Sequence, residues 1–303
     1  MAIGDVSRVT VGDTTELYYL DTGMYDTAEY GAVYIIDDER PALVDSGIGT
    51  NHERILDALS EVGIRREDLA VIAVTHLHLD HAGGAGFLAE ACPNATVYAP
   101  EAGSRHLLDP SRLVEGTKGA VGDQWRYYVD PEPVPEDRLT TFEHGDVIDL
   151  GAHELRVHAA PGHAPHHHVF EDPTNDVVFT ADAAGLYVLQ RDEILPTTPP
   201  PQFDLEGCLA DVEALQALDR GVLCYAHFGP RAADDMLETY ADVLSSWVDR
   251  VAAAREELTD DEAVVDHLAS GTDLGEVWGE RKARAEVAMN TRGVLAYLER
   301  QES

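Results

Sequence analysis

The hydrophobic residues of this chain first follow a strand-like pattern and later a helical one. Short runs rich in Val, Ile, Leu and Tyr fill the first 50 residues, and similar runs resume near residue 138. Between them, residues 51–63 have helical spacing, and residues 69–75, "LAVIAVT", form a continuous apolar run. That run predicts a central strand buried on both faces. Two such series of strands and helices predict an α/β fold with two packed sheets and helices outside.

The pattern changes after about residue 230 and is almost wholly helical from there. Residues 233–258 and 281–301 carry apolar side chains at helical spacing. Seventy residues of helix do not easily form a core of their own. We therefore expect a first domain at residues 1–230 and a helical C-terminal extension at residues 231–303. The extension should pack on the first domain, on a partner subunit as part of a homodimer, or on both.

The charge balance is strongly acidic. The 303 residues include 57 acidic and 21 basic side chains, for a formal net charge of −36, and Lys118 and Lys282 are the only lysines. This small number of cations cannot form a large basic face. We therefore expect neither nucleic acid nor an anionic membrane as a partner. The acidic residues are spread along the chain, a composition typical of proteins from salt-accumulating halophiles.

The cysteines and the N-terminus favour a cytoplasmic protein. Cys92, Cys208 and Cys224 are far apart and form no CxxC pair, so we expect buried thiols. The opening "MAIGDVSRVT" lacks the basic and apolar regions of a signal peptide. No run of about 18 apolar residues is present, so no membrane-spanning helix is expected.

A dense group of metal-binding residue types follows the apolar run at 69–75. In "THLHLDH", His76, His78 and Asp80 are spaced by two, which places them on one side of an extended chain. Three imidazoles and a carboxylate within six residues are costly to bury without partners, so we interpret them, with His81, as metal ligands.

Further ligands should come from other strand ends, because four ligands in one loop cannot all converge on one ion. Three positions qualify: His163 in a Pro-Gly turn, Asp182 after an apolar strand, and His227 after another. All three follow apolar runs, so the sequence predicts one cleft that all seven residues share.

These motifs resemble the metallo-β-lactamase superfamily, and within it the glyoxalase II-like branch. The resemblance rests on HxHxDH at 76–81, PGH at 161–163, "TAD" at 180–182, the terminal histidine before Gly-Pro at 229–230, and "VDSG" at 44–47. "TAD" stands where the family commonly has "TGD". The resemblance covers about residues 10–230 and implies a four-layer αβ/βα sandwich with the catalytic domain in residues 1–230.

The resemblance also implies a role for each matching residue. One metal ion would be held by His76, His78 and His163; a second by Asp80, His81 and His227; Asp182 would bridge them and Asp45 would support the ligand loops. His and Asp donors suit two divalent ions, with zinc first and iron or manganese as alternatives. A metal-bridged hydroxide would attack the carbonyl of a small ester, thioester or lactone, with Asp80 and Asp182 as the catalytic carboxylates.

Two other activities and three substrate contacts are also considered. An iron persulfide dioxygenase-like enzyme would use His76, His163 and Asp182 for one iron, while a phosphodiesterase or nuclease is disfavoured by the acidic charge.

Tyr187, five residues after Asp182, either lines the substrate pocket or is an ordinary buried tyrosine. Because C-terminal helices help to close the substrate site in glyoxalase II-like relatives, the resemblance implies that Asn290 and Arg292 on the last helix lie at the cleft rim. We expect His166, His167 and His168 to have supporting roles.

The acidic composition gives a prediction on salt. Because salt screens the repulsion among the carboxylates, the melting temperature should rise between low and molar KCl. Differential scanning calorimetry across that range measures the effect. A melting temperature that stays flat would contradict the halophile interpretation.

Overall fold

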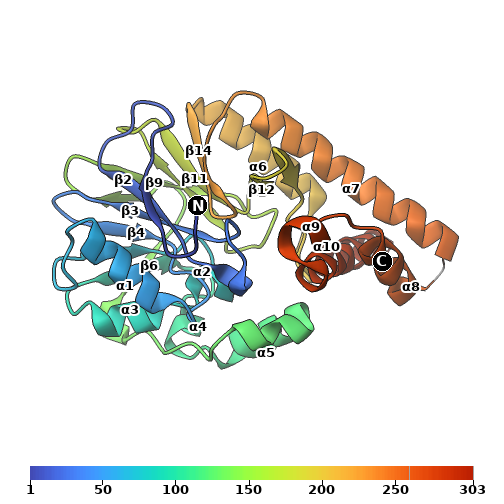
Figure 1. Ribbon diagram of the computed structural model, residues 1–303, viewed down its shortest axis with the longest axis horizontal. Helices are drawn as coiled ribbons and strands as arrows, with labels where there is room; N and C mark the ends of the chain where they lie inside the picture. The colour runs from blue at the N-terminus through green and yellow to red at the C-terminus, as the bar shows by residue number, and fades with distance from the viewer. Residues whose placement is uncertain (259, 303) are drawn as a thin grey trace.

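The computed structural model describes residues 1–258 and 260–302, and its first half forms a seven-stranded sheet (Figure 1). The strands follow chain order, antiparallel from the first to the fourth and parallel from the fourth to the seventh. They are β1 (Val6–Arg8), β2 (Leu17–Asp21), β3 (Ala32–Ile36), β4 (Ala42–Val44), β5 (Val71–Ala73), β6 (Thr96–Pro100) and β7 (Leu139–Phe142).

A six-stranded sheet follows, with the order β15-β14-β11-β10-β9-β8. Its strands pair antiparallel except for β11 and β14, which are parallel. They are β8 (Val147–Asp149), β9 (Glu154–Ala159), β10 (His168–Asp172), β11 (Val177–Ala181), β14 (Val222–Tyr225) and β15 (Gly229–Ala232). A separate hairpin joins β12 (Leu186–Val188) to β13 (Glu193–Leu195).

Helices cover the outer side of each sheet, while α5 (Ser111–Val121) stands apart from the sandwich (Figure 1). Those of the first half are α1 (His52–Glu61), α2 (Leu79–Ala82), α3 (Ala85–Ala91), α4 (Arg105–Leu108) and α5 (Ser111–Val121). Those of the second half are α6 (Leu205–Leu218), α7 (Met236–Leu258), α8 (Asp261–Ser270), α9 (Gly275–Trp278) and α10 (Glu280–Gln301). Short 3-10 turns are η1 (Met24–Asp26), η2 (Gly122–Tyr127) and η3 (Glu136–Arg138).

Three hydrophobic cores hold four layers together. The central core lies between the sheets and includes Tyr34, Phe170 and Phe179. A second core joins the first sheet to α1 and α3, and a third joins the second sheet to α6, α7, α8 and α10. Since burial of apolar surface is the main favourable term in folding, each sheet needs both of its faces covered. The layer order is therefore helix, sheet, sheet, helix, as the sequence predicted.

Several local predictions can be compared with the structure. The run at 69–75 contains β5, which is fully buried between β4 and β6, so the prediction of a central strand is confirmed. The three cysteines are buried and free, also as predicted. The helical pattern expected from residue 231 begins only at Met236, because residues 229–232 form β15. The hairpin β12–β13 was not anticipated from the pattern. In residues 1–258 and 260–302, no helix combines the length and apolarity needed to cross a bilayer.

The turn that carries His163 is fixed by a close contact with α6. A Cβ on Gly162 would lie 2.1 Å from the backbone nitrogen of Cys208, so only glycine allows this approach. The Gly162 N–H donates to the Asp211 carboxylate at 2.7 Å. Asp211 is buried, and burial raises the pKa of its carboxyl from 3.8 to about 6. The turn is therefore held partly by a carboxylate that is costly to ionise.

Replacing Asp211 with Asn should stabilise the protein at neutral pH, because the amide oxygen can still accept from Gly162 without a buried charge. The pKa of Asp211 is higher in the folded state, about 6 against 3.8, so the wild type loses stability as pH rises through that window. The advantage of the variant should grow between pH 4 and pH 7 by up to about 3 kcal/mol. Urea unfolding at both pH values measures it.

The control is Glu213→Gln, which changes an exposed carboxylate of the same helix. Its stability should follow the wild type at both pH values. A difference between Asp211→Asn and the wild type that does not change with pH would contradict the assignment of a raised pKa to Asp211.

Candidate metal centre

The segment after β5 carries four predicted ligands, and it places two of them in each of two donor groups. His78 has an extended backbone and immediately precedes α2, and His76 lies two residues before it, outside any helix or strand. Asp80 and His81 lie in α2, which is a single turn of helix, so the expectation that the chain stays extended through Asp80 is wrong. Because the helix rotates successive side chains by about 100°, Asp80 and His81 reach a different point from His76 and His78. The local change from extended chain to helix thus separates the ligands into two groups.

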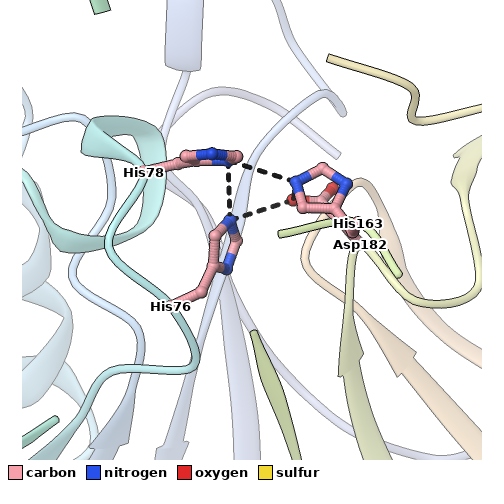
Figure 2. Close-up of side chains that lie close together, drawn as sticks. All are labelled: His76, His78, His163 and Asp182. Carbon is pink, nitrogen blue, oxygen red and sulfur yellow. Dashed lines mark hydrogen bonds and ion pairs between the residues drawn. The ribbon is translucent and has the colours of Figure 1, made fainter. Parts of the chain in front are cut away.

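The first group consists of four donor atoms around one point (Figure 2). His78 Nδ1 lies 3.1 Å from His76 Nε2 and 3.1 Å from His163 Nε2. Asp182 Oδ2 lies 3.3 Å from both His76 Nε2 and His163 Nε2. Metal–nitrogen bonds of about 2.0–2.1 Å in a tetrahedral set would separate the donors by about 3.3 Å. The spacing therefore fits one tetrahedral ion.

The second group lies on the other side of Asp182. The ligand atoms of Asp80, His81 and His227 lie within 4.8 Å of one another. Asp182 Oδ2 is 3.1 Å from His81 Nε2, and Asp182 Oδ1 is 3.6 Å from His227 Nε2. His81 Nε2 is buried and makes no well-aligned hydrogen bond, which is the state expected of a ligand atom aimed at an ion. Since its carboxylate reaches both groups, Asp182 can bridge two ions.

A shell of hydrogen bonds orients these side chains. Asp45 accepts from His81 Nδ1 at 2.8 Å and from the Thr75 N–H at 2.8 Å, the supporting position predicted for it. His167 Nε2 accepts from the Asp182 N–H at 3.2 Å. Since carbonyl oxygens only accept, His163 Nδ1 donates to one at 3.2 Å and His227 Nδ1 to another at 3.0 Å. These contacts leave the Nε2 atoms of His81, His163 and His227 free to coordinate.

The electrostatics of the centre favour neutral imidazoles and an ionised carboxylate. Burial lowers the pKa of His78 to about 4 and also lowers the pKa of His76 and of His163. Burial lowers the pKa of His81 too, but the carboxylates of Asp182 and Asp45 more than offset it and raise that pKa well above its usual value. Neutral imidazole is the form that binds a metal, so most of these ligands need lose no proton at neutral pH.

Burial raises the pKa of Asp182, which is the opposite of its effect on the histidines. The imidazoles of His163 and His81 outweigh that effect and hold the pKa of the carboxyl well below its usual value. The carboxylate is therefore ionised over the whole neutral range and can share its two oxygens between cations.

A cavity of about 220 Å³ opens beside both groups. Its walls come from the ligand loops, from α5, from the 197–202 loop and from α10, and Figure 1 shows α5 standing apart from the sandwich opposite the C-terminal helices. His78, Asp80, His163, Asp182 and His227 line it. Substrate that enters this cavity therefore meets the donor groups directly.

Of the three predicted substrate contacts, one lines this cavity. Asn290 lies in its wall. Tyr187 does not: its hydroxyl donates to Asp192, and the Arg231 guanidinium lies 4.3 Å from its ring centre. Of the two alternatives for Tyr187, the structure therefore matches the second: it is a buried tyrosine of the β12–β13 hairpin, outside the cavity lining. Arg292 is misplaced, because it projects from the outer face of α10 and pairs with Glu262 at 3.1 Å.

Some residues reach the centre only because the tertiary fold brings them there, and the sequence did not single them out. Tyr25 and Tyr128 line the cavity although they lie far from the ligand motifs in the sequence, whereas His166, for which a supporting role is expected, lines it too. The carbonyls of Tyr30 and Thr197, which accept from His227 and His163, have no sequence signal because any residue supplies a carbonyl.

Residues 26–227 match the family model described as the metallo-beta-lactamase superfamily. The chain belongs to the metallo-β-lactamase superfamily. It is a metal-dependent hydrolase of this superfamily, with a His/Asp cluster suited to divalent ions. The superfamily match covers the part of the chain that contains all seven predicted ligands.

Individual relatives agree with this membership. The metallo-beta-lactamase fold-containing protein ST1585 of Sulfurisphaera tokodaii is 25% identical over 283 residues, covering 92% of this chain and 95% of that protein. Its crystal structure, at 24% identity, has a TM-score of 0.70 and covers 96% of this chain and 100% of that one. The protein TTHA1429 of Thermus thermophilus, at 21% identity, has a TM-score of 0.66 over 90% of this chain and 89% of its own. These structures share the fold.

The role of Asp182 can be tested by metal content. Asp182→Ala should lose both ions, because its carboxylate lies beside both donor groups. His78→Ala should lose mainly the ion of the first group and Asp80→Ala mainly that of the second. Mass spectrometry of purified protein after exhaustive dialysis counts the ions. Asp249→Ala, an exposed change on α7, is the control, and full metal content in Asp182→Ala would refute the bridging role.

Proposed function

We propose that this protein is a binuclear hydrolase that cleaves the carbonyl bond of a small ester, thioester or lactone. The observation that carries the proposal is the pair of donor groups that meet at Asp182 beside one cavity. The first ion would be held by His76, His78 and His163, the second by Asp80, His81 and His227. Zinc suits these donors best, with iron or manganese as alternatives.

The residues around the centre can assist hydrolysis in distinct ways. Two bound divalent ions would supply a nucleophile at neutral pH and positive charge beside the scissile carbonyl. The Asp80 side chain is 25% exposed and lines the cavity, so it can orient the attacking water and accept its proton. Asp182 is only 5% exposed, which suits a ligand more than a proton carrier.

Two tyrosines of the cavity wall can contact the substrate. The hydroxyls of Tyr25 and Tyr128 lie 2.5 Å apart, and both residues line the cavity. Burial raises the pKa of both well above the usual value, so both phenols stay protonated at neutral pH. One of the two protons is not needed for the bond between them and can be donated to a substrate oxygen.

The cavity walls support an uncharged acyl or lactone substrate. Leu77, Leu113, Val121, Leu186 and Met289 are among the lining residues. In the described part of the chain, one lining residue is an arginine and none is a lysine, a poor match for phosphodiesters. The acyl-coenzyme A thioesterase MBLAC2 of Gallus gallus is 26% identical over 182 residues, covering 55% of this chain and 62% of that protein. That relative supports the thioester class.

The finer placement of the protein is part of the same proposal. The HxHxDH motif with a terminal histidine supports the glyoxalase II-like branch, and the charge of −36 supports a halophilic source. We also propose a cytoplasmic protein that acts on a small molecule and that can form a homodimer through its C-terminal helices.

A substrate and metal panel tests this function. We expect about two zinc equivalents per chain and hydrolysis of small thioesters or lactones at molar salt. Asp80→Ala should lower kcat by at least about 10²-fold, because it removes both a ligand and a proton acceptor. Asp249→Ala should leave kcat unchanged.

Three results would decide against the proposal. One equivalent of iron together with oxygen consumption would indicate the dioxygenase alternative. Hydrolysis of bis(p-nitrophenyl) phosphate without thioester or lactone turnover would indicate a phosphodiesterase. Full activity in metal-free protein would remove the basis of the proposal.

A further inference from the structure

One face of α10 carries buried polar side chains next to the metal centre. Lys282, Glu286 and Asn290 are spaced by four residues, which places them in line along the helix, and they are only 6%, 5% and 4% exposed. Glu286 and Asn290 also line the cavity. Burying a charged pair and an amide is costly unless each has well-placed partners. The partners of this polar face show what it contacts.

The charged end of the polar face contacts Tyr30. Lys282 Nζ donates to the Tyr30 hydroxyl at 2.9 Å and to Glu286 Oε2 at 2.5 Å. The Tyr30 hydroxyl in turn donates to Glu286 Oε2 at 2.7 Å. The backbone carbonyl of the same Tyr30 accepts from His227 Nδ1 at 3.0 Å. Helix α10 is therefore linked to a ligand of the second group through a single residue.

The amide end of the polar face contacts the 197–202 loop. Asn290 Oδ1 accepts from the Thr198 N–H at 2.5 Å, and its backbone carbonyl accepts from the Thr198 hydroxyl at 2.9 Å. A Cβ on Gly293, one turn further, would lie 1.8 Å from the Thr198 carbonyl oxygen, so glycine lets the loop lie against the helix. The adjacent carbonyl, that of Thr197, accepts from His163 Nδ1 at 3.2 Å. This arm ends on a ligand of the first group.

The two arms meet within the helix. Asn290 Nδ2 donates to Glu286 Oε1 at 3.2 Å, while Glu286 Oε2 accepts from Lys282 and Tyr30. Both carboxylate oxygens of Glu286 are therefore used, and the three side chains form one connected network. Its geometry is fixed by the helix, which packs on α7 and α8, with Val294 and its neighbours in the same hydrophobic core.

We infer that the polar face of α10 positions one histidine of each metal group, His227 through Tyr30 and His163 through Thr197. A carbonyl that accepts from Nδ1 holds the ring in the tautomer whose Nε2 faces the metal, so displacing the carbonyl weakens coordination. Lys282, Glu286 and Asn290 are positioning residues in this scheme, because they touch neither the donor atoms nor a reacting bond. The inference rests on the two-ion assignment and not on the identity of the substrate.

The test is the affinity of each metal group, measured separately in the full-length protein by cadmium NMR with a competing chelator. Lys282→Met and Tyr30→Phe should weaken the second group by about 10- to 100-fold and leave the first nearly unchanged. Asn290→Ala should weaken the first group by a similar factor and leave the second. Resonances are assigned with His78→Ala for the first group and Asp80→Ala for the second.

The selectivity separates positioning from simple stabilisation of the fold. Tyr30→Phe keeps the ring and the Lys282–Glu286 pair, so it remains informative if Lys282→Met does not fold. Gly293→Ala serves the same purpose for Asn290→Ala, because its methyl group would push the loop from the helix. Thermal unfolding of each apo-variant reports global stability independently of metal.

Two control variants complete the design. Lys118→Met removes the other lysine, whose side chain is 46% exposed, and Arg284→Ala removes an exposed side chain of α10 itself. Neither should change either affinity. Equal loss at both groups in proportion to lost stability, or unchanged affinities in folded variants, would overturn the inference. A wild type that binds one ion would instead contradict the binuclear function, and the matching arm would still be tested on that ion.

Discussion

The carboxylate of Asp182 has to be compensated in the interior, and this constraint organises the centre. Its side chain is 5% exposed, and an ionised group at that depth is stable only beside cations or donors. Four histidine side chains lie within 3.6 Å of its oxygens. Burial raises the pKa of the carboxyl, but the imidazoles of His163 and His81 outweigh that effect and hold the pKa well below its usual value. The contacts that keep this carboxylate ionised are therefore the same side chains that form the two donor groups.

The two sheets supply this centre from opposite sides of the sandwich. Parallel strand β5 delivers the HxHxDH turn, while β9, β11 and β14 of the other sheet deliver His163, Asp182 and His227. Because the ligand residues come from both sheets, the distances between them depend on how the two sheets pack. Mutations in the central core should therefore disturb metal binding. α5, α10 and the 197–202 loop form the other walls of the cavity beside the donor groups. Chemistry and substrate choice therefore rest on different parts of the fold.

The scarce lysines show how charge is distributed between surface and interior. The chain carries 57 acidic side chains against 21 basic ones, and one of its two lysines, Lys282, is buried on the polar face of α10. Burial lowers the pKa of Lys282, and Glu286 opposes that effect, so the pair holds together as a unit. The buried ammonium group of Lys282 therefore acts through its hydrogen bonds to Tyr30 and Glu286 and not through the surface charge.

The sequence by itself determined the fold class, the central strand and the grouping of seven ligand candidates, because alternation of apolar residues and strand-end placement are local properties. The ligand roles of those residues stay predictions until metal is measured. The tertiary structure decided what local patterns cannot encode. It placed Tyr187 against Asp192 and Arg292 on an outer face, and it brought Lys282 to Tyr30 across 252 positions of sequence. Such contacts depend on how distant elements pack, and a backbone carbonyl that orients a ligand leaves no trace in residue identity.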